Sequence, residues 1–432
     1  MTGETDTIFA VASGAGRAAV AVLRISGKAT AEIVGRLCRP PPRPRRAALR
    51  LLRDGAGDVL DQAVVLWLPG PGSYTGEDCA ELHLHGGPAI VDGVAEALAA
   101  LGARPAEPGE FTRRAFLNGR MDLLQAEAVA DLIAAESSAQ RRQALQQLGG
   151  ALGGICRGWA DRLLRLLAQQ EALIDFSDED LPDSVEAAML VEIGALQHEI
   201  SAHLHDDRRG ERLRDGLVFA IAGPPNVGKS TLINALAGRD VAIVSPAPGT
   251  TRDVLEARVM LGGVPVTLLD TAGLRETGDA IEAEGVRRAR ARAEAADLVI
   301  VVSAADTDAP PAAANARTLA VANKADLGGT AAAADLRVSA LTGEGMDRLR
   351  AVLAGIAAEL TQAEGPPPLT RARHRAALID AAAHLRDAES ASLAELRGED
   401  LRGALHAVGR ITGQVGAEDI LDSVFGQFCI GK

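Results

Sequence analysis

The chain has 432 residues, long enough for about three domains at roughly 150 residues each. Hydrophobic residues make up 47% of it, enough to bury several cores, which argues against a disordered or fibrous chain. Aromatic residues make up only 2%, which argues against stacking rows of rings on single-stranded nucleic acid. The net charge of −13 disfavours polyanions, so local basic patches or a partner would have to attract nucleic acid.

The sequence predicts a soluble, cytoplasmic protein without a membrane span. Its long apolar runs, such as Leu298 to Val302, have the length of a buried strand, far below the ~20 residues of a membrane-spanning helix. Met1 to Asp6 is polar and acidic, unlike the basic start of a signal peptide. The cysteines are scattered without a CxxC pair, which favours reduced thiols over disulfides or a zinc site: Cys38, Cys79, Cys156 and Cys429.

The first 117 residues mix short apolar runs with Gly and Pro turns, which predicts an α+β domain. We expect its strands at Ala19 to Ile25, Ala63 to Leu68 and Ala80 to Leu84. An Arg/Pro segment, Arg39 to Arg46, interrupts this pattern. Its composition favours a solvated loop, with contact to phosphate as the less favoured alternative.

Helical periodicity follows from about Leu123 to His205. The charged run Asp206 to Asp215 is typical of a linker. Residues 216 to about 360 alternate apolar strands with helical segments, which predicts a parallel sheet flanked by helices. The predicted apolar stripe of the first helical part contains Leu163, Leu166, Leu167 and Ile174.

Helical periodicity returns after the break at Pro366 to Pro368. A single helical bundle interrupted by an inserted domain would explain helical segments on both sides of the α/β part. Periodicity alone does not show that the two halves pack together. The expected stripes contain Leu378, Ala382 and Leu385, and then Leu405, Val408, Ile411 and Val415.

The strongest motif is Gly223-Pro-Pro-Asn-Val-Gly-Lys-Ser230, which follows an apolar strand (Leu217 to Ala222) and opens a helix (Thr231 to Leu236). This context is the one a P-loop requires. Its glycines let backbone N–H groups turn toward phosphate oxygens, helped by the positive end of the helix. Lys229 would reach the β- and γ-phosphates, and the Ser230 hydroxyl would bind Mg²⁺.

Polar motifs also follow three further predicted strands. Asp270-Thr-Ala-Gly273 follows Val264 to Leu269; its carboxylate can hold a Mg²⁺-bound water, and the Gly273 N–H can approach a γ-phosphate. Asn323-Lys-Ala-Asp326 follows Leu319 to Ala322, and Ser339-Ala340 follows Leu336 to Val338. All these motifs lie at strand ends, where α/β folds bind ligands.

The Asp326 carboxylate can accept hydrogen bonds from N1–H and N2–H₂ of guanine, whereas adenine offers no such donor pair. A site built to pair with one group rejects an analogue that lacks it by up to ~10⁴-fold. Together the motifs predict a GTP-binding domain.

The residue that activates water for hydrolysis is less evident. Leu274 stands where Ras-like proteins place a water-orienting Gln, and an aliphatic side chain cannot polarise water. Pro248 to Asp253 (PGTTRD) is a candidate switch I, in which the Thr251 hydroxyl could complete Mg²⁺ coordination. Charged residues crowd the following switch II region, where spacing alone favours a solvated helix start: Arg275, Glu276, Asp279, Glu282 and Glu284.

Taken together, the motifs GPPNVGKS, PGTTRD, DTAGLRE, NKAD and the terminal CIGK closely resemble the tRNA-modification GTPase MnmE (TrmE) family. The resemblance covers the whole chain. The GTPase motifs are shared with many relatives, whereas CIGK and the N-terminal motifs are specific. Those N-terminal motifs are LRISG (Leu23 to Gly27), YTGED (Tyr74 to Asp78), ELHLHGGP (Glu81 to Pro88) and PGEFTRRAFLNGRMDLLQAEA (Pro108 to Ala128).

The resemblance implies a multidomain fold. An α+β tetrahydrofolate-binding and dimerisation domain would span residues 1–117, and an inserted α/β Ras-like P-loop G domain residues 214–362. A discontinuous all-α helical domain would comprise residues 118–213 and residues 363–432, the latter ending in CIGK.

The resemblance also implies an activity. With the FAD-containing partner MnmG, the homodimeric protein would install a carboxymethylaminomethyl or aminomethyl group at C5 of the wobble uridine of certain tRNAs. The one-carbon unit would come from 5-formyl- or 5,10-methylene-tetrahydrofolate. GTP hydrolysis would need Mg²⁺ and K⁺ and would be coupled to dimerisation of the G domains.

By resemblance, a K⁺ ion would stabilise charge between the phosphates, as an arginine finger does elsewhere. Its matching positions are Asn226, Thr250 and the carbonyls of Ser245 and Ala247; Ser230 and Thr251 match the Mg²⁺ ligands, and Glu282 the catalytic residue that orients water. The full GTP-binding set is Asn226, Val227, Gly228, Lys229, Ser230, Thr231, Ser245, Thr250, Thr251, Asp270, Thr271, Ala272, Gly273, Asn323, Lys324, Asp326, Ser339 and Ala340.

The family's folate contacts match Arg24, Glu81 and Lys432. The pterin edge presents the same N–H and NH₂ donors as guanine, so a carboxylate such as Glu81 is the expected hydrogen-bond acceptor. Arg24 and Lys432 suit the anionic tail or the ring oxygens of the folate. Arg120 stands where the family often has Lys, which keeps the charge and alters the geometry of that contact. Cys429 beside this pocket is either a functional thiol that handles a one-carbon intermediate or an inert one.

Two histidine pairs, His83/His85 and His203/His205, lack a nearby third ligand, so packing is favoured over metal binding. Two other functions remain possible. A regulatory scaffold like ribosome-assembly GTPases would use GTP only to control docking, but usually carries a basic RNA-binding module. A folate-dependent transferase acting without a partner would form product from this protein and tRNA alone.

Overall fold

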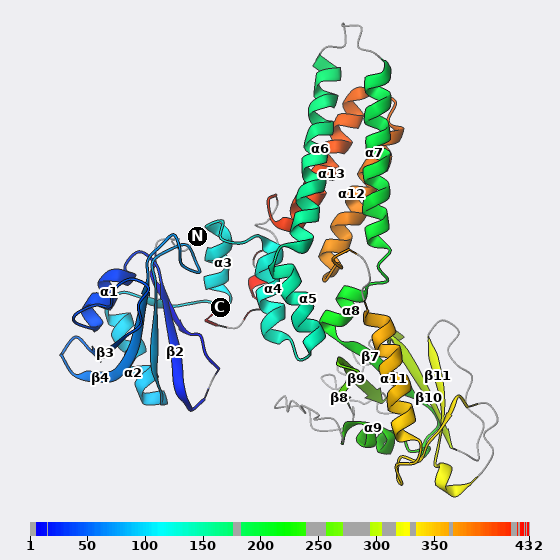
Figure 1. Ribbon diagram of the computed structural model, residues 1–432, viewed down its shortest axis with the longest axis horizontal. Coiled ribbons are helices and arrows are strands. Elements are labelled where there is room, and N and C mark those ends of the chain that lie inside the picture. The colour runs from blue at the N-terminus through cyan, green and yellow to red at the C-terminus, as the bar shows by residue number, and fades with distance from the viewer. Residues whose placement is uncertain are drawn as a thin grey trace, which may run out of the picture. The chain divides into compact units, whose positions relative to one another are not determined.

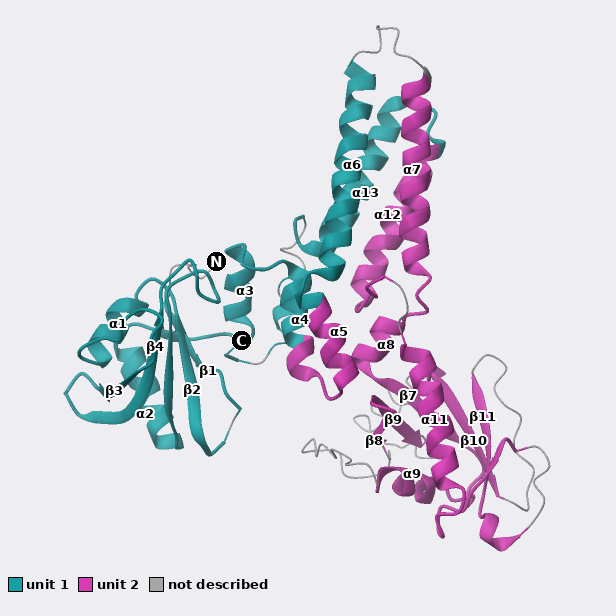
Figure 2. Cartoon of the chain, viewed as in Figure 1, with its two compact units in different colours: residues 1–130, 147–182, 390–432 teal, residues 131–146, 183–389 magenta. Residues whose placement is uncertain are grey.

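The computed structural model describes residues 6–14, 16–175, 183–238, 256–270, 294–304, 317–328, 334–362, 366–415, 421, 424–426, 428 and 430–431. The chain forms two compact units, coloured separately in Figure 2. Unit 1 contains residues 1–130, 147–182 and 390–432, and unit 2 contains residues 131–146 and 183–389. Within the described residues, no helix is both long and apolar enough to cross a bilayer.

Unit 1 begins with a mixed six-stranded sheet in the order β3-β4-β5-β2-β1-β6 (Figure 1). All neighbouring strands are antiparallel except β1 and β6, which are parallel. The three strands expected from the sequence are confirmed, each longer by one to four residues at its start or end. The strands are β1 (Ile8–Val11), β2 (Ala18–Ser26), β3 (Ala48–Arg53), β4 (Val59–Leu68), β5 (Cys79–Gly86) and β6 (Arg104–Pro105).

Two helices, α1 (Thr30–Leu37) and α2 (Pro88–Ala100), cover one face of this sheet. Alternate strand residues point to that face, as strand geometry requires, and they form an aliphatic core with the helices. Helix α3 (Glu110–Leu117) contributes Phe111 to a smaller core with Ile8 and Ala10 of β1. As expected, the residues between α1 and β3 form a mostly exposed loop.

Helices from distant parts of the sequence pack together in unit 1. Helix α6 (Ala151–Asp175) lies along α13 (Ala394–Thr412), and the Gln170 side-chain amide donates to the Ala394 carbonyl at 3.0 Å (Figure 1). The structure thereby supplies a packing contact that periodicity could not show. Helices α4 (Leu123–Ala134) and α5 (Ser138–Leu148) precede α6. The C-terminal segment packs on α4 through Leu421, Val424, Phe425 and Phe428.

Unit 2 contains a second six-stranded sheet in the order β12-β11-β10-β7-β9-β8. Five strands are parallel and the edge strand β8 is antiparallel, so the parallel sheet with flanking helices is confirmed. Its core is aliphatic. The strands are β7 (Leu217–Ala222), β8 (Glu256–Leu261), β9 (Val264–Asp270), β10 (Leu298–Ala304), β11 (Thr318–Asn323) and β12 (Leu336–Arg337).

Two helices pack on this sheet, α9 (Lys229–Ala237) and α11 (Met346–Thr361). The short 3₁₀ helix η2 (Ala325–Leu327) follows β11. Two longer helices of the unit, α7 (Asp183–Leu204) and α12 (Ala372–Ser390), approach each other where Gly194 faces Glu389. The expected stripe Leu378, Ala382 and Leu385 is buried in α12. Val415 was assigned wrongly to the last stripe, because α13 ends at Thr412 and Gly413 has a φ of +80°.

The linker predicted at Asp206 to Asp215 is wrong, since residues Arg209–Asp215 form helix α8. The charged run folds because its charges are paired. The buried Glu211 carboxylate accepts hydrogen bonds from Arg208 at 2.8 Å and from Arg375 of α12 at 2.8 Å. Pairing with hydrogen bonds is what makes a buried charge tolerable. Arg212 also donates to Asp297 at 2.8 Å, which ties α8 to the residue preceding β10.

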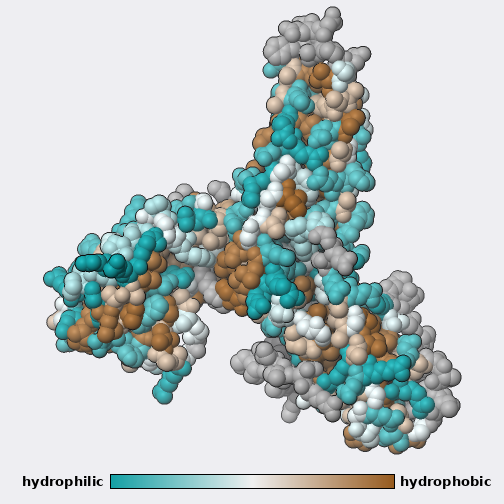
Figure 3. All heavy atoms as spheres, in the orientation of Figure 1, coloured by the Kyte–Doolittle hydropathy of each residue, from teal (hydrophilic) through white to brown (hydrophobic). Residues whose placement is uncertain are grey.

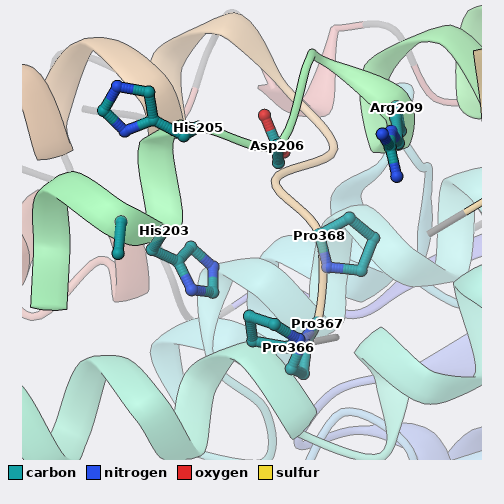
Figure 4. A pocket seen from close by; sticks show the side chains of 8 residues that line it. His203, His205, Asp206, Arg209, Pro366, Pro367 and Pro368 are labelled. Carbon is teal, nitrogen blue, oxygen red and sulfur yellow. The ribbon is translucent and has the colours of Figure 1, made fainter. Parts of the chain in front are cut away.

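A small cavity of about 130 Å³ lies where α7 and α8 meet the segment Pro366 to Pro368 (Figure 4). His203 is buried on its wall and hydrogen-bonds the backbone of Pro367. Burial lowers the pKa of His203 against the opposing effects of Asp206 and Glu199, and Arg375 lowers it further. His203 is therefore held neutral in the folded protein at neutral pH.

Replacing Gly210 of α8 by alanine is expected to destabilise unit 2. Alanine favours helix more than glycine does, but a Cβ at this position would overlap the Leu369 carbonyl and lie 2.8 Å from Pro368 Cβ. Crowding of this kind costs about 1–3 kcal/mol. Chemical denaturation should show a lower midpoint for Gly210→Ala. The control Gly355→Ala, in open space on α11, should raise the midpoint, because it adds about 0.5–1 kcal/mol to the free energy of unfolding. Equal midpoints for the two variants would contradict the packing described for Gly210.

Unit 2 is also expected to lose stability as the pH falls from 7 to 5.5. The unfolded chain binds a proton at the ordinary histidine pKa, whereas folded His203 resists protonation, so the stabilisation is present above ~6.5 and is lost below it. His203→Gln should flatten this dependence in thermal unfolding measured across that range. His205→Gln, at an exposed neighbouring position, should leave it unchanged.

Candidate functional site

The loop between β7 and α9 has the backbone of a phosphate-binding turn. Gly223, Asn226 and Gly228 all have positive φ angles, +155°, +64° and +91°. A Cβ on Gly228 would lie 2.5 Å from the Asn323 side-chain nitrogen, and one on Gly223 would overlap the Val302 carbonyl. Only glycine fits at both positions. The loop thus passes close to its neighbours and leads into a helix whose first N–H groups lack intrahelical acceptors.

Lys229 and Ser230 begin α9. The buried Lys229 ammonium donates to the carbonyls of Gly223 at 3.0 Å and Pro224 at 2.8 Å, so it is enclosed by its own loop. The Ser230 hydroxyl donates to Asp270 Oδ2 at 3.3 Å. This pairing places a hydroxyl and a buried carboxylate side by side. Such hard oxygen donors suit Mg²⁺, so the residues present fit that ion.

The base-binding end is built from the loops after β11 and β12. The Asn323 amide donates to the Val227 carbonyl at 2.9 Å and accepts from the Ala340 N–H at 3.0 Å. The buried Ser339 hydroxyl donates to Asp326 Oδ1 at 2.5 Å. Asp326 itself is exposed, and this hydrogen bond anchors one oxygen of its carboxylate. A carboxylate oriented in this way can read a pair of N–H donors.

These loops share one edge of the sheet. The P-loop follows the central strand β7, whose neighbours are β9 on one side and β10 on the other. The chain therefore reverses its direction across the sheet at β7, and such a switch point is where open α/β sheets bind ligands. Among the predicted residues, the structure gathers Asn226, Val227, Gly228, Lys229, Ser230, Thr231, Asp270, Asn323, Lys324, Asp326, Ser339 and Ala340 at this edge.

The remaining predicted residues of the nucleotide site lie outside the described residues. They include the whole candidate switch I, the end of the DTAG motif, the K⁺ positions other than Asn226, and the candidate catalytic acid. The residues are Ser245, Ala247, Thr250, Thr251, Thr271, Ala272, Gly273 and Glu282. The C-terminal Cys429 and Lys432 also lie outside the described residues.

A second constellation lies on the sheet of unit 1. Arg24 of β2 and Glu81 of β5 are register partners, and the guanidinium donates to Glu81 Oε1 at 2.9 Å. Both side chains are about one-fifth exposed. The Arg24 guanidinium also lies 5.2 Å from the Tyr74 ring centroid and 5.8 Å from that of Phe111. A cation and a carboxylate flanked by rings can bind a flat polar heterocycle.

The C-terminal segment reaches the same sheet. Ile430 forms a β-bridge with Pro108, and a Cβ on Gly431 would overlap the Val11 carbonyl at the end of β1. Val11 pairs with Leu23, next to Arg24. The described part of this segment therefore lies beside β1, the strand that pairs with β2, which carries Arg24. Arg120 lies beyond α3, where its aliphatic part packs near Gly76.

Sequence reasoning missed Tyr74 and Phe111 as members of this constellation. A signal was available, because Tyr74 is the single tyrosine of the chain. Burial raises the pKa of Tyr74, while its hydrogen bond to Thr112 (2.8 Å) and the charge of Arg24 oppose that rise. The phenol is thus neutral and available as a hydrogen-bonding group.

The histidines lie in separate surroundings. His85 Nδ1 lies 2.7 Å from the buried Asp61 carboxylate, and His83 lies 3.5 Å from Glu81. Burial alone would raise the pKa of Asp61, but hydrogen bonds from His85 and the Gln62 N–H lower it. His205 Nδ1 lies 2.6 Å from the Ser201 carbonyl.

Comparisons with known proteins decide the family. The model of the GTP-binding protein TrmE N-terminus matches residues 7–120, and that of the MnmE helical domain matches residues 123–429. The tRNA modification GTPase MnmE of Granulibacter bethesdensis is 58% identical over 437 residues, with 99% of each chain covered. The chain belongs to the tRNA modification GTPase MnmE family. The resemblance read from the motifs is confirmed.

Other MnmE proteins are comparably similar. That of Gluconacetobacter diazotrophicus is 60% identical with 100% of both chains covered, and that of Acidiphilium cryptum is 53% identical with 99% of both covered. Among solved structures, Aquifex aeolicus Era Y63A bound to GDP·AlF₄⁻ is 27% identical over 39% of this chain and 66% of its own. Its TM-score is 0.25.

The geometry predicts that Asp326→Asn lowers GTP affinity by roughly 100-fold or more, because an amide turns one acceptor into a donor facing the guanine amine. The variant should instead favour xanthosine triphosphate, whose 2-oxo group accepts that donor. Titration with fluorescent nucleotides measures both. Glu344→Gln, which removes the same charge from a nearby exposed loop, should bind GTP as the wild type does; a loss there, or none in Asp326→Asn, would contradict the assignment.

Proposed function

We propose that this MnmE protein is a K⁺-dependent GTPase that acts with FAD-containing MnmG on the wobble uridine of certain tRNAs. Together they install a carboxymethylaminomethyl or aminomethyl group at C5 with a one-carbon unit from a reduced folate. The observation that carries the proposal is the Ser339-anchored Asp326 carboxylate at the same sheet edge as the P-loop. This arrangement supports guanine selection with the triphosphate held by the β7–α9 loop.

At the nucleotide site, Lys229 and the N-terminus of α9 would neutralise phosphate charge. Lys229 must leave the carbonyls of Gly223 and Pro224, which it now contacts, to reach the phosphates. Mg²⁺, when bound, supplies charge neutralisation between phosphate oxygens. Ser230 would hold it directly, Asp270 through a water, and Thr251 as a further hydroxyl ligand. The closeness of Ser230 and Asp270 supports this assignment.

We propose K⁺ coordination by the Asn226 side chain, with Thr250 and the carbonyls of Ser245 and Ala247 as further ligands. Asn226 is exposed and has a left-handed backbone, so its side chain is free to turn toward a bound nucleotide. Glu282 would orient the attacking water, since Leu274 cannot. Closure of two G domains would complete the site, which requires GTP and K⁺ to bind the closed state more tightly than the open one.

For the folate site we propose that Glu81 reads the pterin donors and that Arg24 and Lys432 bind oxygens or the anionic tail. Arg120 and Tyr74 would contribute at the rim. The partial exposure of the Arg24–Glu81 pair and its contacts with Tyr74 and Phe111 support this site. From the family resemblance we place Cys429 at the same site; it lies outside the described residues.

A homodimer formed through unit 1 would cover exposed apolar side chains on its sheet. Val20, Leu49 and Leu51 are 51%, 58% and 45% exposed. They alternate with residues packed under α1 and α2, so they point to the opposite face. Hydrophobic side chains also gather on the face of unit 1 visible in Figure 3. A second copy of the chain would cover this area from water.

The deciding experiment is mass analysis of wobble uridine in tRNA from cells whose own gene is deleted and replaced by this one. The wild type should restore the modified nucleoside in the presence of MnmG. Glu282→Ala should bind GTP normally but fail to hydrolyse it, and should not restore the modification. Wild-type hydrolysis should fall when Na⁺ replaces K⁺.

Several outcomes would contradict the proposal. Equal GTPase rates in Na⁺ and K⁺ would exclude the cation mechanism. Loss of GTP binding in Glu282→Ala would remove its assigned role. Unmodified tRNA with full GTPase activity, and no binding of tetrahydrofolate, would indicate a regulatory scaffold. Product from this protein and tRNA without MnmG would indicate a transferase that acts alone.

A further inference from the structure

Residues 33–53 carry seven arginines and no acidic residue, within a chain whose net charge is −13. The segment runs from α1 through the Arg/Pro loop to the end of β3, the edge strand of the N-terminal sheet. We call the six arginines after α1 the arginine edge. They are Arg39, Arg43, Arg45, Arg46, Arg50 and Arg53.

The charges of the arginine edge are not neutralised by carboxylates. In the described part of the chain, Arg36 pairs with Glu32 at 3.6 Å, but no ion pair involves the six arginines that follow. Arg39, Arg43 and Arg46 are exposed; Arg39 precedes Pro40, and Arg43 lies between Pro42 and Pro44. Unpaired guanidinium groups concentrated in this way create a local positive field that the overall charge conceals.

Backbone carbonyls hold the other three guanidinium groups in place. Arg45 donates to the Gly72 carbonyl at 2.8 Å, Arg50 to the Pro40 carbonyl at 2.6 Å, and Arg53 to the Gly57 carbonyl at 2.7 Å. These contacts orient each group, leave its positive charge in place, and use only part of its five N–H donors. Less side-chain entropy is therefore lost when an anion binds.

Protection of a sheet edge does not account for the whole cluster. Charged residues on an edge strand discourage pairing with other chains, and Arg50 and Arg53 of β3 fit that role. Arg39, Arg43 and Arg46 lie in the loop before the strand, which has no strand edge to protect. Their gathering requires another explanation.

We propose that the arginine edge binds the phosphate backbone of tRNA. This inference rests on the proposed function, which supplies tRNA as the partner. Guanidinium forks match phosphate oxygens in bidentate geometry, and phosphate contacts position a nucleic acid without reading its sequence. The described segment offers no aromatic side chain from residue 39 to residue 53 on which a base could stack, so it suits the backbone of a folded RNA.

The test uses the full-length chain and an unmodified tRNA transcript with a wobble uridine. Binding is measured by fluorescence anisotropy from ~50 to ~200 mM salt. The triple variant Arg39→Gln, Arg43→Gln, Arg46→Gln should bind about tenfold more weakly at low salt. Its plot of log affinity against log salt should be less steep by about 2, because each lost phosphate contact removes roughly 0.7–0.9. GTP hydrolysis should be unchanged, which also reports folding.

A matched control removes three exposed arginines elsewhere, as Arg141→Gln, Arg142→Gln, Arg165→Gln. It should bind tRNA like the wild type. Equal binding by both triple variants, or equal weakening of both, would overturn the inference while leaving the proposed function intact. Unchanged tRNA binding with lost binding to MnmG would assign the arginine edge to an acidic protein surface instead. Failure of the wild type to bind tRNA at any salt would contradict both.

Discussion

The buried side chain of Asn323 connects the three loops on which nucleotide recognition depends. Its amide nitrogen donates to the P-loop at Val227, and its oxygen accepts from Ala340 in the loop after β12. The distance between the phosphate end and the base end of the site is thereby set by one side chain. A buried amide with both ends satisfied is costly to replace, because either unpaired end would lose its hydrogen bond without gaining water. This framework connects the loops that carry Lys229, Ser230 and Asp326, as the proposed nucleotide site requires.

Charge pairing has a comparable role at the junction of unit 2. The run from Asp206 to Asp215 is strongly charged, yet part of it is a helix with a buried glutamate. Arg375 contacts Asp206 and Glu211 from a helix about 165 residues further along the chain. Helix α8, which precedes the first strand of the sheet of unit 2, is therefore held by contacts with α12, which follows that sheet in the chain. His203 lies in the same junction, where burial lowers its pKa.

Two surfaces of unit 1, the Arg24–Glu81 pair and the arginine edge, differ in whether carboxylates neutralise their positive charge. At the Arg24–Glu81 pair, opposite charges meet between two rings, which suits a small polar ligand whose edge carries both donors and acceptors. At the arginine edge, the guanidinium groups meet only backbone carbonyls. Positive charge there stays uncompensated, and this suits a large polyanion. The two proposed sites of this small domain therefore differ in charge compensation: carboxylate pairing at Arg24 and, within the described residues, none at the arginine edge.

Short-range patterns in the sequence determined the loop between β7 and α9, the strand before it and the place of Asp326 after β11, because glycine conformations and strand ends are set by neighbouring residues. They determined the family as well. Only the tertiary structure decided that α6 packs on α13, that Asp206 to Asp215 forms a helix, and that Tyr74 and Phe111 flank Arg24. These features join residues far apart in the chain. The charge of Asp206 to Asp215 by itself predicted a solvent-exposed linker. The ion pair that buries Glu211 depends on Arg375, which is distant in the sequence, so no local pattern could locate it.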